Sequence, residues 1–249
     1  MIIILSPSKS IDFKENEIRK DATIPSFEDE ACHLMSLLSG FRADEIAEKE
    51  KTSIRIALDT YRFIQTFQVK STPQKEAVFA YCGNAYSKLN GKEMGENSLL
   101  FLQKHFRILS ALYGILRPLD KIKPYRLDMN SKLIPDLYGY WKQKITATVA
   151  DLLKANDYLL VNLASVEYFK MIDLKALPKQ TRIITPVFQQ EKNGKWISNS
   201  LFAKQARGLM LRFIAENQIT EPTYLQAFDS EGYFYNPRLS NENDWYFTR

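Results

Sequence analysis

Apolar residues in this chain come in short runs, and the length of these runs restricts the fold more than any other feature. The run Ile2–Leu5 stops at Ser6-Pro7, a pattern typical of a buried strand that ends in a turn. Residues 158–161 form a second apolar run of strand length. No run approaches the roughly 20 residues that a membrane-spanning helix needs, and the opening run lacks the basic segment of a signal peptide. We therefore expect a soluble, cytoplasmic protein without a membrane partner.

Helical periodicity separates the short apolar runs. Ser26 and Asp29 have the spacing of a capping box and predict the start of a helix that Gly40 ends. Apolar residues at helical spacing in residues 141–153 predict a long amphipathic helix. Further helices are expected from Ser98 onward, over residues 54–67 and over residues 204–217.

The remaining strands are predicted from turn signals and aromatic residues. Asn193-Gly194 between residues 182–188 and 196–201 is a strong hairpin signal, because both residues tolerate the positive φ of a tight turn. Strands and helices follow one another without regular alternation, which favours an α+β fold with a mixed sheet over a doubly wound α/β fold. No repeat or linker divides residues 1–249, so we expect a single compact domain. Short strands are also expected at residues 77–81, 233–235 and 245–247.

Cysteine and histidine are too scarce to predict a metal site. Zinc sites need about four ligands, usually in close pairs, and Cys32, His33, Cys82 and His105 do not provide that spacing. We expect no metal and no cofactor, and two buried or half-buried thiols, with a reactive sensor thiol as the alternative. Glycine-rich phosphate loops, dinucleotide fingerprints, nucleophile elbows and HExxH are missing, which removes the familiar enzyme classes but not enzymes in general.

Charge is distributed unevenly along the sequence. The formal net charge is +5, yet residues 1–60 contain eight basic and twelve acidic side chains, whereas residues 101–150 contain nine basic and three acidic ones. This asymmetry predicts a localised basic surface, as expected for a phosphate-rich partner. An ordinary solvated face is the alternative.

Two polar clusters follow predicted strands. Residues 6–9, Ser-Pro-Ser-Lys, come directly after the first strand, and their hydroxyls and lysine could hold a phosphate group. Asn162, Ser165 and Glu167 follow the apolar run 158–161, at a strand end where active-site residues tend to gather. The structural alternative for residues 6–9 is a turn with a solvated lysine. For Ser165 and Glu167 it is the cap of a short helix.

Two further segments are basic. Lys204 and Arg207 share one face near the start of a predicted helix, where a bound anion would offset their unfavourable position in the helix dipole. An ordinary solvated helix face is the alternative. Six basic residues between Lys104 and Arg126 are interleaved with aromatic ones, as suits a surface that touches phosphates and bases. Within that segment, residues 109–116 resemble the hairpin of a helix-hairpin-helix motif, and an apolar strand and turn is the alternative.

At these four segments the sequence resembles the YaaA family of bacterial proteins. The pattern S-P-A-K is present at residues 6–9, with Ser8 in place of alanine. L-S-G-L-Y-G-x-L-R-P-x-D-x-x-x-P-Y-R-L-E-M is present at residues 109–129, with Ala111 for glycine and Asp128 for glutamate. N-L-A-S-x-E-Y-F-K at residues 162–170, A-K-x-A-R-G at 203–208 and S-E-G-Y-F at 230–234 complete the match.

The resemblance implies a function that the composition alone does not. It implies survival of peroxide stress and protection of DNA, with duplex and junction DNA bound in a positively charged cleft. It also implies a single α+β domain that carries a helix-hairpin-helix element. We expect no obligate protein partner.

The leading hypothesis is a DNA-binding protein that holds backbone phosphates in one cleft. The rival is a DNA- or nucleotide-processing enzyme, in which Glu167 acts as acid or base unless it pairs with Lys9 or Arg126. Iron handling or direct peroxide sensing is a third, less favoured hypothesis, because suitable ligands are few. The expected DNA contacts are Lys9, Arg107, Arg117, Lys121, Lys123, Arg126, Lys204 and Arg207. The enzyme pocket would contain Lys9, Asn162, Ser165 and Glu167.

Overall fold

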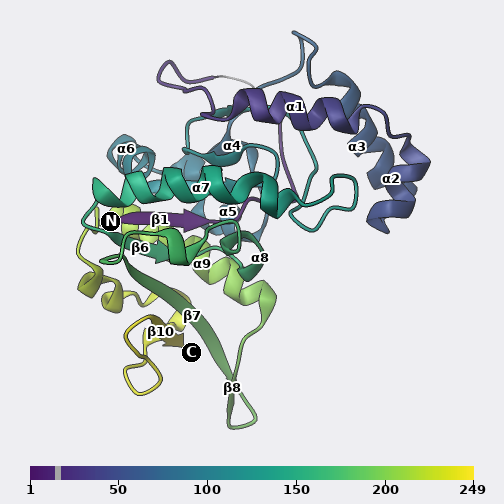
Figure 1. Ribbon diagram of the computed structural model, residues 1–249. Coiled ribbons are helices and arrows are strands. Elements are labelled where there is room, and N and C mark those ends of the chain that lie inside the picture. The colour runs from purple at the N-terminus through teal and green to yellow at the C-terminus, as the bar shows by residue number, and fades with distance from the viewer. Residues whose placement is uncertain (15–17) are drawn as a thin grey trace.

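The computed structural model describes residues 1–14 and 18–249, and a twisted mixed sheet forms its centre (Figure 1). The strand order is β4-β3-β1-β6-β7-β10-β9, and β8 pairs with β7. The pairs from β3 through β10 are parallel, whereas β4, β8 and β9 join antiparallel, so the α+β prediction with a mixed sheet is confirmed. The strands of this sheet are β1 Ile2–Leu5, β3 Phe106–Ser110, β4 Gly114–Leu116, β6 Leu159–Asn162, β7 Arg182–Lys192, β8 Lys195–Ile197, β9 Phe234–Tyr235 and β10 Asp244–Thr248.

The central strand β1 explains why the first apolar run is continuous. Ile3 lies opposite Phe106 of β3 on one side and Val161 of β6 on the other. Parallel strands in the middle of a sheet are covered on both faces, so every side chain of Ile2–Leu5 is buried. β2 Lys75–Glu76 and β5 Lys121–Ile122 form a separate two-stranded ribbon.

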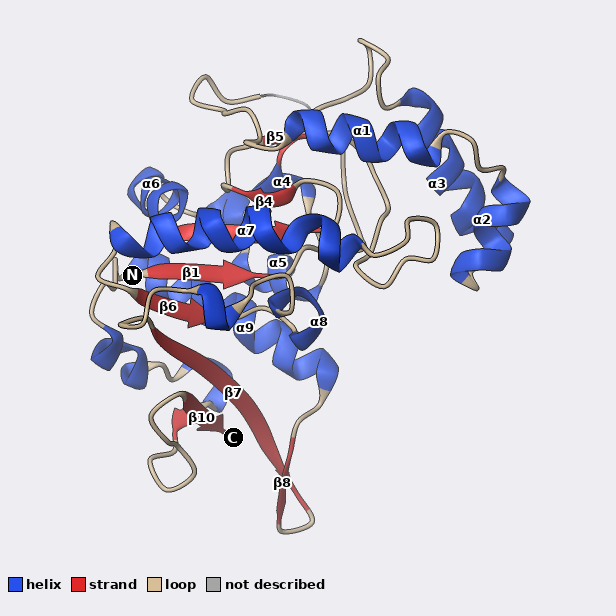
Figure 2. Cartoon of the chain, viewed as in Figure 1, coloured by secondary structure: helices blue, strands red, loops and turns tan. Residues whose placement is uncertain are grey.

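Helices cover both faces of the sheet (Figure 2). The long helix α7 lies in front of β1 in this view, and α5 and α9 pack against each other behind it. α1, α2 and α3 form a group to the upper right. The helices are α1 Glu28–Leu38, α2 Ala43–Glu50, α3 Ile54–Thr66, α4 Ala77–Ala80, α5 Asn84–Leu89, α6 Glu96–His105, α7 Leu137–Lys154, α8 Val166–Phe169 and α9 Ser200–Glu216. Short 3-10 helices span Gly91–Glu93, Leu174–Ala176, Pro222–Ala227 and Ser230–Gly232.

The strongest local sequence patterns predict the secondary structure correctly. The amphipathic helix at residues 141–153 is α7, and its Trp141 is fully buried against the β3–β4 turn. The Asn193-Gly194 hairpin joins β7 to β8, with φ values of 52° and 74°. In the described part of the chain, no helix combines the length and apolarity needed to cross a membrane.

Several local predictions are wrong. A strand is predicted at residues 77–81, but Ala77–Ala80 form α4, and the N–H groups of Ala77 and Val78 donate to the carbonyl oxygens of Asp120 and Pro118. α1 begins after Phe27 without a side-chain cap, so the capping box of Ser26 and Asp29 is not formed. Two helices begin earlier than predicted, α6 at Glu96 and α9 at Ser200.

The helix-hairpin-helix element is not confirmed. Residues 109–116 form the end of β3, a tight turn and β4, and all of them are buried. Leu109 pairs with Ile115 across the two strands, so the backbone groups there serve the sheet. β5 follows β4 in the chain, where the motif would require a helix.

Candidate functional site

A pocket of about 300 Å³ lies at the carboxyl ends of β1 and β6, and we name it the strand-end pocket. Crevices outside the carboxyl ends of parallel strands are where sheet-containing folds usually bind ligands. The loop after β1, the loop after β6 and the first turns of α9 all contribute to it. Its polar lining includes Ser6, Lys9, Ser165, Glu167, Lys204 and Arg207.

Hydrogen bonds join the loops that follow β1 and β6. Ser6 Oγ accepts from the Ser165 backbone N–H at 2.8 Å and donates to Ser165 Oγ at 3.1 Å. The hydroxyl of Tyr86 on α5 donates to the Ser6 carbonyl oxygen at 3.0 Å. These contacts hold the Ser-Pro-Ser-Lys turn and the residue 162–168 loop in one place, although the sequence separates them by about 150 residues.

Two glycines let the remaining walls of the strand-end pocket approach closely. A Cβ atom at Gly83 would lie 2.2 Å from Ser8 Oγ, so glycine allows the Ser-Pro-Ser-Lys turn to contact the start of α5. A Cβ atom at Gly208 would lie 1.9 Å from the Ala85 carbonyl oxygen. Gly208 therefore lets α9 pack directly on the backbone of α5, which places Lys204 and Arg207 beside the turn.

Lys9 forms an ion pair across the pocket. Its Nζ lies 2.7 Å from a carboxylate oxygen of Asp128, and the Lys9 side chain is 65% exposed. Both residues also line a neighbouring hollow of about 200 Å³ that contains Arg126, which we name the Arg126 pocket. The two pockets therefore adjoin at the Lys9–Asp128 pair.

Arg207 forms no ion pair with any residue that the structure describes. Its side chain is largely removed from water, and this burial lowers the pKa of the guanidinium. None of the described residues forms an ion pair or hydrogen bond with the guanidinium. Lys204, one helical turn earlier on α9, is exposed at the same pocket. A half-buried arginine without a partner is costly, so this position favours an anionic ligand.

Glu167 on α8 likewise forms no ion pair with a described residue. Burial raises the pKa of its carboxyl group, and the nearby Asp128 raises it further. A hydrogen bond from the Asn130 backbone and the charge of Lys9 oppose this shift only in part. The expected alternative pairing of Glu167 with Lys9 or Arg126 is not seen among the described ion pairs, and Lys9 pairs with Asp128 instead.

Asn162 and Arg126 lie in hollows next to the strand-end pocket. Asn162, at the end of β6, is 5% exposed and lines a pocket between β6 and β7, which we name the β6–β7 pocket. Arg207 lines both that pocket and the strand-end pocket. The structure thus brings Lys9, Glu167 and Arg207 together and places Arg126 and Asn162 in adjoining pockets.

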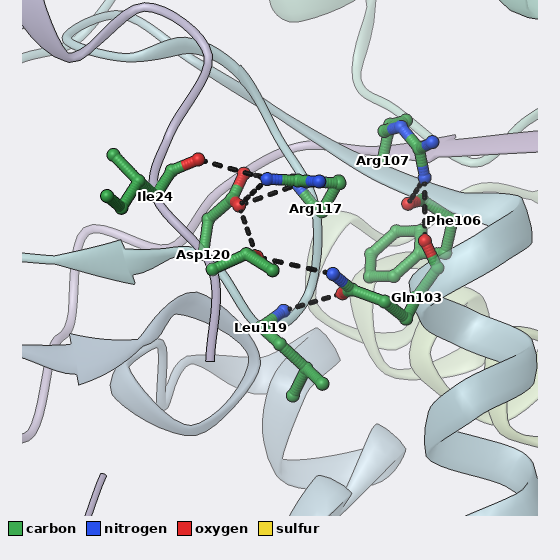
Figure 3. A network of polar contacts seen from close by, with 8 residues as sticks. Ile24, Gln103, Phe106, Arg107, Arg117, Leu119 and Asp120 are labelled. Atoms are coloured by element: carbon green, nitrogen blue, oxygen red, sulfur yellow. Dashed lines mark hydrogen bonds and ion pairs between the residues drawn. The ribbon is translucent and has the colours of Figure 1, made fainter. Parts of the chain in front are cut away.

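Two arginines of the 104–126 segment, Arg107 and Arg117, lie in a separate network of polar contacts (Figure 3). Arg117 contacts the buried carboxylate of Asp120 through Nε at 3.1 Å and through a terminal nitrogen at 2.9 Å. Arg107 donates to the carbonyl oxygens of Gln103, Lys104 and Phe106 at the end of α6. Burial and the neighbouring Arg117 lower the pKa of Arg107 to about 10. Both guanidiniums are therefore engaged inside the protein.

Two lysines of that segment also lie outside the three pockets. Lys123 Nζ donates to the Phe67 carbonyl oxygen at 2.6 Å and lies over the Phe67 ring. Lys121 belongs to β5, in the two-stranded ribbon with β2. The clustering of basic residues in the sequence therefore does not correspond to a cluster at the strand-end pocket.

Sequence reasoning missed the contribution of α5. Gly83, Asn84, Ala85 and Tyr86 line the strand-end pocket. The one local signal is a glycine in a chain that contains only nine. Asp128 was read only as a substitution in the family pattern, and its ion pair with Lys9 could not be inferred from a separation of more than 100 residues.

The thiols and possible metal ligands offer no alternative site. Cys32 is partly buried, whereas Cys82 is exposed, so the prediction that both are buried or half-buried is wrong for Cys82. Desolvation raises the pKa of both thiols, which disfavours the reactive thiolate form. No group of three or more metal-binding side chains is found among the residues that the structure describes.

Comparison with known proteins assigns the family. A UPF0246 protein from Neisseria gonorrhoeae is 41% identical over 256 residues, which covers 100% of this chain and 98% of the relative. UPF0246 proteins from Ralstonia pickettii and from Azoarcus are 40% and 38% identical, and each comparison covers 100% of this chain and 99% of the relative. The family model described as "Peroxide stress protein YaaA" matches residues 1–239. The chain therefore belongs to the YaaA family of peroxide stress proteins.

Proposed function

We propose that this protein binds DNA during the response to peroxide stress and that the strand-end pocket holds a backbone phosphate. The observation that carries the proposal is the half-buried guanidinium of Arg207, which has no partner among the described residues. A phosphate group would supply two acceptor oxygens in the planar arrangement that a guanidinium binds best. The family's role in peroxide stress supports DNA as the partner, since DNA is a target of peroxide damage.

The surroundings of Arg207 suit a chain of phosphates better than a single free ion. Lys204 and Lys9 border the same pocket, and Arg126 continues the series of cations beyond Lys9. The Lys9–Asp128 pair is partly exposed, so a phosphate can compete with Asp128 for the lysine at small cost. Contacts of this kind depend on charge and shape and carry little sequence information.

Fluorescence anisotropy with a labelled DNA duplex and a labelled four-way junction tests the proposal. Arg207→Ala should weaken binding about tenfold or more, because hydrogen bonds to charged groups contribute roughly 1.5–3 kcal/mol. Arg207→Lys should recover part of the loss. Lys154→Ala is the matched control, since Lys154 carries the same charge at the far end of α7 and lines none of the three pockets. Equal affinities of Arg207→Ala and the control would contradict the proposal.

Glu167 supports a second candidate, a DNA- or nucleotide-processing enzyme. Its raised pKa and its lack of an ion pair favour proton transfer, which a carboxylate held by cations would perform poorly. Ser165 and Lys9 border the same pocket and could position a substrate. Incubation of the wild-type protein with nucleotides and with DNA should then yield a product, and Glu167→Gln should abolish turnover while binding persists. Absence of product with the wild-type protein would remove this candidate.

A further inference from the structure

We propose that the β6–β7 pocket binds a nucleobase whose phosphate occupies the strand-end pocket, so that the ligand unit is a single unstacked nucleotide. The inference rests on the phosphate site proposed above and adds the identity of the group beside it. The β6–β7 pocket has a volume of about 500 Å³ and lies between the carboxyl end of β6 and the middle of β7. Nothing in the DNA-phosphate proposal requires it.

The walls of the β6–β7 pocket are mostly apolar. Val166 on α8 is 73% exposed, and Leu174, in the 3-10 helix Leu174–Ala176, is 46% exposed. Apolar side chains of this kind are usually covered. Phe169 and Val187 line the same pocket and are only partly buried. Exposed apolar side chains gathered around a hollow typically mark a binding site. A planar base would cover them and gain contact with the Phe169 ring.

Two polar side chains give the pocket a means to recognise a base edge. Asn162 Oδ1 accepts from the Ala164 backbone N–H at 3.0 Å, which fixes the orientation of the amide. Its Nδ2 reaches Thr185 Oγ1 only at 3.5 Å, the limit of a hydrogen bond. The Asn162 amide N–H groups and the Thr185 hydroxyl can therefore bind ring or exocyclic atoms of a ligand. An apolar cavity with a few fixed polar groups is the usual form of a small-molecule site.

Arg207 connects the two halves of the proposed site. It lines both the β6–β7 pocket and the strand-end pocket, so a ligand that occupies both must pass beside its guanidinium. A nucleotide meets this requirement, because it joins an apolar planar base to a phosphate through a sugar. A purely apolar ligand would leave Asn162, Thr185 and Arg207 without partners, which is unfavourable.

The proposal is tested with a DNA duplex that carries fluorescein at one end and a single 2-aminopurine in a mismatched base pair. Anisotropy reports DNA binding, and 2-aminopurine intensity reports extrusion of the base from the stack. In parallel, nucleoside 5′-monophosphates and ribose 5-phosphate compete for the same site. Nucleoside monophosphates should bind at least tenfold more tightly than ribose 5-phosphate, which lacks the base. Val166→Ala and Thr185→Val should each reduce this ratio of affinities severalfold without weakening the binding of ribose 5-phosphate. Thr185→Val preserves shape, so it isolates the hydroxyl, and a melting curve confirms that each variant is folded.

The outcomes distinguish a nucleotide extruded from DNA from a free nucleotide. They also distinguish failure of the base pocket from failure of the phosphate site. A severalfold rise in 2-aminopurine intensity supports a nucleotide extruded from DNA. A preference for nucleoside monophosphates without that rise supports a free nucleotide as the ligand. If DNA binds but the intensity is constant and ribose 5-phosphate competes as well as a nucleotide, the base pocket is refuted and the phosphate site remains. If neither DNA nor any phosphate compound binds, the phosphate site and the base pocket are both refuted.

Discussion

At the scale of single residues, Glu167 is a partly buried carboxyl group that forms no ion pair with any described residue. Lys9, Lys204 and Arg207 line the same pocket, yet none of them forms an ion pair with Glu167. Lys9 pairs with Asp128 instead. Desolvation is the largest cause of its raised pKa, and the charge of Asp128 adds to it. A carboxyl group whose folded pKa lies above its unfolded value of 4.5 favours the folded state most when protonated. Its contribution to stability is complete below pH 4.5 and is lost as the pH rises through the folded value.

The variant Glu167→Gln should therefore be more stable than the wild type at pH 7 to 8, because the amide removes the ionised form and can still accept the Asn130 hydrogen bond. The difference in melting temperature should shrink as the pH falls toward 4.5. Thermal unfolding followed by circular dichroism across this range measures it. Glu48→Gln, on the exposed side of α2, is the control and should show no such trend. A Glu167→Gln protein that melts below the wild type at neutral pH would contradict this account.

Single-residue contacts were the least predictable part of the site. Five of the residues chosen from the sequence do line one pocket, namely Lys9, Ser165, Glu167, Lys204 and Arg207. Their partners were not predictable, because the Lys9–Asp128 contact depends on how distant loops pack. A charged residue in a sequence has many possible partners, and only tertiary structure selects one.

At the scale of elements, the predictable parts are those whose local pattern agrees with their tertiary environment. β1 and residues 159–161 of β6 are apolar because they are covered on both faces, and α7 has one apolar face because it lies on the sheet. α4 escaped prediction because its first N–H groups donate to carbonyl oxygens about 40 residues away. α5 gave no signal for the site apart from the glycine that precedes it, although its contact with α9 forms one wall of the pocket.

The contact between α5 and α9 can be tested with Gly208→Ala. Replacing glycine by alanine inside a helix normally stabilises by about 1 kcal/mol. Here the added Cβ atom would lie 1.9 Å from the Ala85 carbonyl oxygen, so the helices must separate. We expect a loss of roughly 1–3 kcal/mol in the free energy of unfolding, measured by urea denaturation, together with weaker DNA binding. Gly40→Ala, where a Cβ atom meets nothing within 4 Å, should be neutral or slightly stabilising. A Gly208→Ala protein as stable as this control would show that α5 and α9 can move apart freely.

At the scale of the whole molecule, the predicted DNA contacts divide into two groups. Lys9, Lys204 and Arg207 converge at the strand ends, whereas Arg107 and Arg117 are bound to protein oxygens beside α6 and β5. The sequence suggested one group, because residues 104–126 are rich in cations. The fold uses several of those cations internally, and it assembles the pocket from segments that lie far apart in the chain.

This division predicts different salt dependence for the two groups. The logarithm of DNA affinity should fall linearly with the logarithm of salt concentration, with a slope of about −0.9 for each phosphate neutralised on a duplex. Lys204→Ala should reduce the magnitude of that slope by about one, because Lys204 is exposed at the strand-end pocket and free to neutralise a phosphate. Arg117→Ala should leave the slope unchanged, because its guanidinium is already paired with Asp120.

Arg117→Ala should instead lower stability. Asp120 is fully buried and would lose its guanidinium partner, while the Thr23 hydroxyl and the backbone N–H of residue 117 would still donate to it. A loss of roughly 1–3 kcal/mol in the free energy of unfolding is expected for a buried acceptor left partly unsatisfied. Anisotropy titrations at four salt concentrations and urea denaturation of the same two variants test both halves of the prediction. If Arg117→Ala reduces the slope as much as Lys204→Ala does and unfolds like the wild type, the DNA path crosses the α6 side of the molecule and the strand-end pocket is not its centre.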